Sequence, residues 1–150
     1  MMTFRNLTFD LLEGAMQVVG LASDSDQRRR WLSLDGSYVM VEAVPWPEGE
    51  PSSAAVTDLV TARVLSSYVE GHSGEVHLMG SVPVTGASEA RAGRLSFLAD
   101  EGEMLEALVL IVAGKEGDLA VLHTAWPSAA AENGIRAALS LVASAVLHQD

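Results

Sequence analysis

The chain has 150 residues, of which 49% are hydrophobic and 19% charged, and none is cysteine. This length and apolar content predict one folded domain over residues 1–150 rather than a disordered segment. The absence of cysteine excludes disulfide bonds, zinc–thiolate sites and thiol catalysis. The 20 acidic residues outnumber the 9 basic ones and give a formal net charge of −11 at pH 7.

An acidic surface repels phosphate backbones and anionic lipid headgroups, so the charge argues against nucleic-acid and membrane-surface roles. The same charge is compatible with a basic protein partner. One local exception is the run Arg28-Arg29-Arg30, which follows Asp24 and Asp26. This mixture of signs is typical of a solvated loop rather than of a phosphate site.

The beginning of the chain, Met1–Asp10, carries Arg5 and Asn6 where an export signal would need an apolar run. The longest strictly apolar stretch is Ala107–Ala113, far short of the roughly 20 residues that span a bilayer. We therefore expect a cytoplasmic protein that does not insert into membranes.

Short apolar alternations in the first third of the chain predict strands. The first covers Leu7–Leu11, while Met16–Ala22 is apolar but ambiguous between a strand and a short helix. Two more, Trp31–Leu34 and Tyr38–Val44, flank Asp35-Gly36, which suits a hairpin turn because both positions tolerate positive φ. The second arm should divide its side chains between two faces: Val39, Val41 and Ala43 on one, and Tyr38, Met40 and Glu42 on the other.

A proline-rich connector, Pro45–Pro51, precedes the first predicted helix. Ser52 or Ser53 can cap this helix, which should run to about Glu70 and end in the segment Gly71–Gly74. Helical spacing gives it a buried stripe of Val56, Leu59, Val60, Val64 and Tyr68.

The next part of the chain predicts four strands: Glu75–Val84, Ala90–Ala99, Met104–Ala113 and a last one from Leu119 to Trp126 that Pro127 ends. Both faces of Met104–Ala113 are apolar, so this strand should be interior and covered on both sides. The apolar face of Glu75–Val84 should consist of Val76, Leu78, Val82 and Val84, and that of Ala90–Ala99 of Leu95, Phe97 and Ala99.

A last helix should extend to about Leu147, with Ser128 or Asn133 as its cap. Gly134 inside a helix costs about 1 kcal/mol relative to alanine, which favours the later start. Its buried face is predicted to comprise Ile135, Ala138, Leu139, Val142 and Val146. Together the elements predict an α+β fold, a mainly antiparallel sheet of about six strands with two main helices packed on it.

No catalytic or phosphate-binding motif is present in the chain. His72 and His77 are five residues apart with Gly74 between them, so they do not share a helical face as metal-binding histidine pairs do. We expect no metal site, no cofactor and no catalytic residue set.

The best candidate for a polar site is the sheet face turned away from the helices. Alternation could bring Glu42, His77, Arg94, Glu106 and His123 together there, where they could bind a polar ligand or support acid–base chemistry. The alternative is that a half-covered antiparallel sheet simply turns polar side chains toward water.

Two tryptophans, Trp46 and Trp126, each stand next to a proline at the end of a strand. Such residues can anchor a binding interface or cover the end of a core. Leu108 and Leu110 should leave an exposed apolar face, which either Met16–Ala22 or a second copy of the chain in a homodimer would cover.

The order of elements resembles the PsbP-like superfamily, which includes the photosystem PsbP subunit and the Mog-type Ran-binding proteins. The resemblance comprises the helix Val56–Glu70, the strands Val76–Val84 and Leu95–Ala99, and the segment Leu119–Pro127 with the helix after it. It implies an antiparallel sheet with helices packed on it and a binding or assembly role. It transfers no functional residue, because no specific motif matches.

The sequence therefore favours a non-enzymatic binding or accessory protein that recognises another protein. A small-molecule-binding or hydrolytic enzyme that uses the polar sheet face is the first alternative. The second is a relative of the acidic, dimeric secretion chaperones, which share this size and charge but usually open with a helix, whereas this chain is expected to open with a strand.

Overall fold

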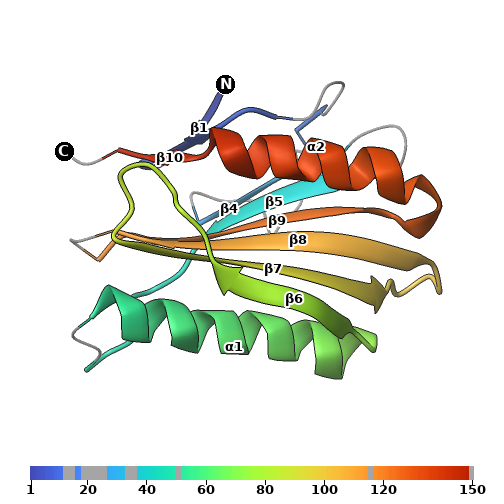
Figure 1. Cartoon of the computed structure of the whole chain (residues 1–150), viewed down its shortest axis with the longest axis horizontal. Helices are drawn as coiled ribbons and strands as arrows, with labels where there is room; N and C mark the ends of the chain where they lie inside the picture. The colour runs from blue at the N-terminus through green and yellow to red at the C-terminus, as the bar shows by residue number, and fades with distance from the viewer. Residues whose placement is uncertain (12–15, 18–26, 33–36, 50–51, 115–116, 149–150) are drawn as a thin grey trace.

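The computed structural model describes residues 1–11, 16–17, 27–32, 37–49, 52–114 and 117–148. In this part of the chain an antiparallel sheet forms the middle layer, with helix α1 on one face and helix α2 on the other (Figure 1). The α+β fold with a mainly antiparallel sheet is confirmed. Its 7 described strands follow the order β3 (Met16–Gln17), β4 (Arg28–Leu32), β5 (Tyr38–Ala43), β9 (Leu119–Pro127), β8 (Met104–Ala113), β7 (Glu89–Leu98) and β6 (Glu75–Ser81).

Strand β8 lies in the interior of the sheet, paired with β7 on one side and β9 on the other. Residues from Ala107 to Ala113 are all buried, because alternate side chains pack under α1 and under α2. The prediction of an interior strand covered on both faces is confirmed.

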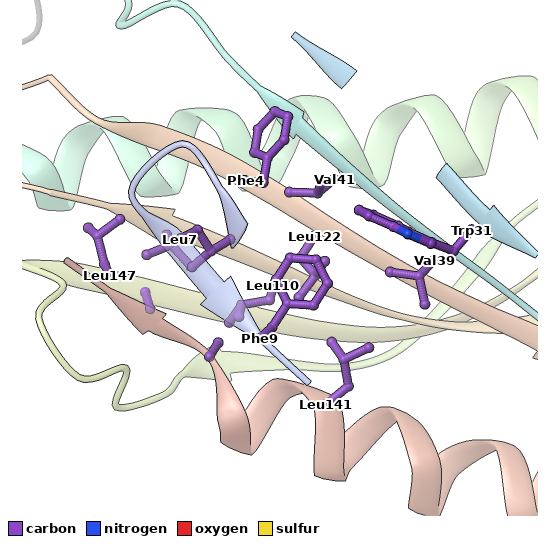
Figure 2. Packing of buried hydrophobic residues seen from close by; sticks show 13 residues of the cluster. Phe4, Leu7, Phe9, Trp31, Val39, Val41, Leu110, Leu122, Leu141 and Leu147 are labelled. Atoms are coloured by element: carbon purple, nitrogen blue, oxygen red, sulfur yellow. The ribbon is translucent and has the colours of Figure 1, made fainter. Parts of the chain in front are cut away.

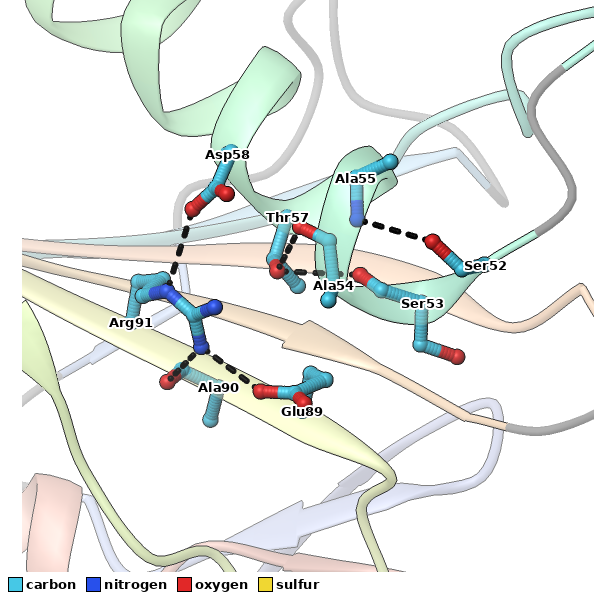
Figure 3. Close-up of polar contacts among 9 residues, drawn as sticks. All are labelled: Ser52, Ser53, Ala54, Ala55, Thr57, Asp58, Glu89, Ala90 and Arg91. Atoms are coloured by element: carbon cyan, nitrogen blue, oxygen red, sulfur yellow. Dashed lines mark hydrogen bonds and ion pairs between the residues drawn. The ribbon is translucent and has the colours of Figure 1, made fainter.

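Helix α1 (Ser53–His72) begins where the sequence predicts. Ser52 is its N-cap, and the Ser52 hydroxyl accepts a hydrogen bond from the backbone N–H of Ala55 at 3.2 Å. The second turn is linked to the sheet by an ion pair, at 3.3 Å, between Asp58 and Arg91 of β7 (Figure 3).

The buried face of α1 includes Val56, Val60 and Tyr68, as predicted. It also includes Thr57 and Thr61, which the apolar pattern did not indicate. The Thr57 hydroxyl donates to backbone carbonyls in the preceding turn (Figure 3), and this allows a polar side chain to be buried.

Helix α2 (Ala131–Ser144) differs from the prediction at both ends. It follows a short 3₁₀ turn, Ser128–Ala130, and its N-cap, Ala130, has no side-chain hydrogen bond, so neither Ser128 nor Asn133 caps it. It ends at Ser144 instead of near Leu147. The residues that follow form the two-residue strand β10 (Val146–Leu147), whose apolar side chains extend the helical pattern without being helical.

The predicted buried stripe of α2 is wrong at Leu139, whose side chain is 54% exposed. Leu141 is buried in its place, at 1% exposure. The buried positions Ala138 and Leu141 are three residues apart and share one helix face, whereas Leu139 is rotated about 100° away from Ala138.

A second, 3-stranded sheet covers the α2 side of the molecule beside the helix. Its order is β1 (Met2–Phe4), β2 (Leu7–Phe9) and β10, with β2 in the middle. Only the central strand lies within the predicted segment Leu7–Leu11, and β1 and β10 are too short for a periodicity to show.

The small sheet and α2 together close the larger core cluster (Figure 2). Phe4, Leu7 and Phe9 pack there against residues from the large sheet and α2, namely Trp31, Val39, Val41, Leu110, Leu122 and Leu141. The expected exposed face at Leu108 and Leu110 is therefore wrong: both are buried, because α2 and the β1–β2 hairpin cover that face. The predicted cover by Met16–Ala22 concerns residues outside the described part of the chain, apart from those of β3.

Strand β6 departs most from its predicted role. The alternation over Glu75–Val84 predicted a buried side, but the strand ends at Ser81 and all of its residues are exposed. It lies at the edge of the sheet. A register irregularity between Val76 and Leu78 places Val76 opposite Leu95 and Leu78 opposite Arg94, so the two apolar side chains project from different faces.

Candidate functional site

A pocket of about 390 Å³ opens on the α1 side of the large sheet. We call it the β5–α1 pocket. It is lined by residues of β4, β5, β7, β8, β9 and α1, together with the β7–β8 turn: Arg28, Tyr38, Met40, Glu42, Ser67, Tyr68, His72, Phe97, Ala99, Asp100, Leu105 and His123.

Strand alternation builds the floor of this pocket. The odd-numbered side chains of β5, Val39 and Val41, enter the core, so Glu42 and its even-numbered neighbours face α1. His123 of β9 is aligned with Met40 of β5 and therefore projects from the same face. The predicted division of the β5 side chains between two faces is confirmed.

His123 lies at the centre of a buried polar network and is 5% exposed. Its Nε2 is 3.1 Å from Oε1 of Glu42, and its Nδ1 is 2.8 Å from the hydroxyl of Tyr68. The other carboxylate oxygen of Glu42 accepts a hydrogen bond from Nη2 of Arg28 at 3.1 Å. One carboxylate thus joins a buried imidazole to a guanidinium at the pocket edge.

The network has a defined direction. The hydrogen bond from His123 is the largest cause that lowers the pKa of Glu42, ahead of the opposing effect of burial. An ionised carboxylate only accepts hydrogen bonds, so Nε2 of His123 must donate to it. In the neutral ring Nδ1 is then an acceptor, and the Tyr68 hydroxyl donates to Nδ1.

Burial raises the pKa of Tyr68 far above that of an ordinary tyrosine. Burial also raises the pKa of Tyr38, while a side-chain hydrogen bond to Tyr68 partly offsets the increase. Both side chains therefore stay protonated at neutral pH. With the Tyr68 proton directed at His123, four side chains, those of Arg28, Glu42, His123 and Tyr68, form one continuous chain of hydrogen bonds.

The Glu42 carboxylate and the two tyrosine hydroxyls are poorly suited to proton transfer at neutral pH. A general acid or base works best with a pKa near the operating pH. Here Glu42 is moved further below neutrality, and Tyr38 and Tyr68 further above it. Satisfied hydrogen bonds at each end of the His123 ring hold the pocket wall in one geometry.

The structure separates the polar residues that the sequence placed on one face. Glu42 and His123 face α1, in the pocket. On the opposite face Arg94 pairs with Glu106 at 3.5 Å, and His77 contacts Ser96 at 2.8 Å. Strand register and the irregularity in β6 cause the division, and neither can be read from one sequence.

The two tryptophans occupy different environments. Trp126 is 1% exposed and packs under α2 with Leu108 and Ala138, so it offers no surface to a partner. A β-carbon added at Gly134 would overlap the Trp126 indole ring, and the glycine therefore permits the close approach of the helix. Trp46 is half-buried against the cluster beneath α1.

Sequence reasoning missed most of the pocket. The helical spacing of Tyr68 predicts a core residue and nothing more. In the structure its hydroxyl also forms a hydrogen bond with His123. Phe97 was likewise assigned to an apolar strand face. Tyr38 could have been found from the sequence, because strand alternation already places it on the same face as Glu42.

No described helix combines the length and the apolar character needed to cross a membrane. Nor do three or more histidine, aspartate or glutamate residues come together, within the described part of the chain, in an arrangement that could hold a metal ion.

The fold of this chain, an antiparallel sheet between two helices, is also found in proteins of solved structure, PsbP-like proteins among them. Comparison with solved structures finds 22 matching chains. CyanoP, the cyanobacterial PsbP of Synechocystis, matches with a TM-score of 0.72 and 11% identity over 95% of this chain and 87% of its own.

The Ran-binding protein Mog1p of Saccharomyces cerevisiae matches with a TM-score of 0.64 and 11% identity, over 95% of this chain and 90% of its own. LpqN of Mycobacterium tuberculosis, described as involved in cell envelope biogenesis, matches with a TM-score of 0.58 and 9% identity. The match covers 95% of this chain and 83% of LpqN. No family model matches the sequence, and no curated protein matches it. The similarity therefore establishes the fold alone.

Proposed function

We propose that this protein is a non-enzymatic accessory protein that recognises another protein by adding an extended segment of the partner to strand β6. The observation that carries the proposal is that β6 is an edge strand with every residue exposed. Within the described chain it pairs with β7 on one side and with no strand on the other. An open edge offers backbone donors and acceptors to an incoming strand.

The side chains of β6 support the same proposal. Leu78 is 71% exposed and Met79 is 53% exposed, and their positions opposite Arg94 and Gly93 place them on different faces of the sheet. A partner strand would therefore find an apolar contact above and below its backbone. The irregularity between Val76 and Leu78 interrupts the ladder with β7, so the longest regular stretch of β6 is Leu78–Ser81.

The charges near the start of β6 favour a basic partner. The end of α1 and the β7–β8 turn lie close together, since His72 and Asp100 are 3.7 Å apart. Exposed acidic side chains gather along these segments: Glu70, Glu75, Asp100, Glu101 and Glu103. They would attract lysine or arginine residues at one end of the bound segment.

The comparisons are compatible with this role, since Mog1p is described as a Ran-binding protein. We extend only the general role, recognition of a protein, to this chain. A cytoplasmic location belongs to the same proposal and rests on the charge and composition of the sequence.

The test uses peptides of about ten residues that alternate valine with threonine, with lysines at one end. Matched peptides carry glutamates at that end, or a central proline that cannot pair. The lysine peptide should bind best. Leu78→Glu should abolish the binding, whereas Leu139→Glu, the same change at an exposed leucine on α2, should leave it intact. Equal binding of all the peptides, or equal loss in both variants, would contradict the proposal.

A second copy of the chain is the competing occupant of β6. It would appear in analytical ultracentrifugation as a concentration-dependent dimer that Leu78→Glu abolishes. The repulsion between two chains of charge −11 disfavours such a homodimer, although salt screens it over about 8–10 Å. Dimerisation through β6 would replace the proposed partner.

A further inference from the structure

We infer that the β5–α1 pocket binds an organic cation, a guanidinium or ammonium group carried on a short apolar chain. The pocket is distinct from the proposed protein-binding edge, since none of its described lining residues belongs to β6, but its rim residue Asp100 is also part of the acidic cluster near the start of that strand. Its volume of about 390 Å³ lies within the range of small-ligand sites.

The first argument is the charge of the pocket. Glu42 lies in its floor as an ionised carboxylate, and Asp100 lies at its rim with a largely exposed side chain. His123 and Arg28 each bond to a different oxygen of Glu42. Because a carboxylate has about four acceptor positions, Glu42 can accept a further donor from a ligand.

The second argument is the aromatic wall. The rings of Tyr68 and Phe97 meet edge-on, with their centroids 4.9 Å apart. The centroid of the His72 ring lies 5.9 Å from that of Phe97. Aromatic faces beside a carboxylate are a common environment for ammonium and guanidinium groups. Met40 and Leu105 supply apolar surface for the chain that carries the cation.

The third argument is Arg28, which already places a guanidinium on Glu42 at the pocket edge. Its side chain is 42% exposed, so this internal pair can open toward solvent. Arg28 thus shows which chemical group Glu42 accepts, and it also competes with an incoming cation for that carboxylate.

An anionic ligand fits the same residues poorly. It would face Asp100 at the rim, while Arg28 and Glu42 neutralise each other in their ion pair. The imidazole of His123 is bonded at both nitrogens, and His72 faces Asp100 at 3.7 Å. The overall charge of −11 further raises the local concentration of cations over that of anions.

The experiment is an NMR titration of the whole protein with butylguanidinium, butanol and butyrate, which share a chain and differ in charge. Butylguanidinium should bind roughly tenfold more tightly than butanol and shift the amides of the pocket residues. Butyrate should not bind there. Equal binding of the three probes, or shifts located elsewhere, would overturn the inference.

Two pairs of variants test the residues. Glu42→Gln should weaken the binding of butylguanidinium roughly tenfold, while Glu132→Gln, the same charge change on α2, should not. Arg28→Gln should strengthen it, while Arg63→Gln on the exposed side of α1 should leave it unchanged. If Glu42→Gln fails to fold, Asp100→Asn at the exposed rim should still weaken binding. Unchanged affinity in Asp100→Asn and Arg28→Gln would contradict the assignment.

The cation can belong to a free metabolite or to an arginine or lysine side chain of another protein. Agmatine and N-acetyl-arginine amide distinguish these sources, since the second carries the flanking amides of a peptide. Tighter binding of agmatine assigns a free amine, and tighter binding of the amide assigns a protein side chain. Failure of both would overturn the inference while leaving the proposal for β6 intact.

Discussion

The substitution Gly134→Ala reverses the usual effect of replacing a helical glycine. Helix propensity alone favours alanine over glycine by about 1 kcal/mol inside a helix. In this protein, however, a β-carbon at position 134 would overlap the indole ring of Trp126. Trp126 is 1% exposed and packed on all sides, so the ring can move aside only by disturbing the core under α2. Overpacking of this kind costs about 1–3 kcal/mol.

Subtracting the gain in helix propensity from this cost leaves an expected loss of up to about 2 kcal/mol in the free energy of unfolding. At about 2–4 °C per kcal/mol for a chain of this size, the melting temperature should fall by several degrees. Gly71→Ala provides the matched control, because it lies in α1 and a β-carbon there would meet nothing within 4 Å. Urea unfolding of the three proteins measures the effect. Gly134→Ala as stable as Gly71→Ala would refute the close packing of Gly134 on Trp126.

Three further predictions concern stability. Leu141→Asp should lower the free energy of unfolding in urea by several kcal/mol, because it buries an unpaired charge. Leu139→Asp should change it little, because that side chain is exposed. Equal effects of the two substitutions would contradict the orientation of α2. Ser52→Ala should cost about 1 kcal/mol by removing the N-cap of α1, and an unchanged unfolding curve would show that the cap contributes nothing. Glu42 has a folded-state pKa below 4.5, so its stabilising contribution should be present above pH 4.5 and disappear as the pH falls through the lowered value. The difference in unfolding free energy between wild type and Glu42→Gln should therefore shrink in acid, and a difference that grows would contradict the assigned network.

Local signals explain the parts of the fold that the sequence predicted correctly. Ser52 after a proline-rich connector marks the start of α1, and its hydroxyl does cap the helix. The apolar residues on both faces of Met104–Ala113 require cover on both sides, and the strand is interior. In each case the decisive information lies within a few neighbouring residues.

The wrong predictions depend on long-range contacts. The register irregularity in β6 places Val76 and Leu78 on different faces, which a simple alternation cannot represent. Val146 continues the apolar spacing of α2, yet it pairs with Thr8 near the other end of the chain. Leu139 and Leu141 are equally apolar, and only the packing of α2 on the sheet decides which is buried.

The candidate site could be predicted only in part for the same reason. Glu42 and His123 stand out in the sequence as polar residues within strands, but they are 81 positions apart and meet only through the pairing of β5 with β9. Tyr68 joins them from α1. His77, Arg94 and Glu106 lie on the opposite face because register places them there.

The central claim, that β6 binds an extended segment of another protein, is tested most directly by amide hydrogen exchange of the whole protein with and without the lysine-ended peptide. An added strand would satisfy the backbone groups on the open side of β6, so the outward-facing amides within Leu78–Ser81 should exchange more slowly in the complex. The account predicts this protection on β6, with the amides of α2 unchanged. Peptide binding that protects another surface and leaves β6 unprotected would contradict it.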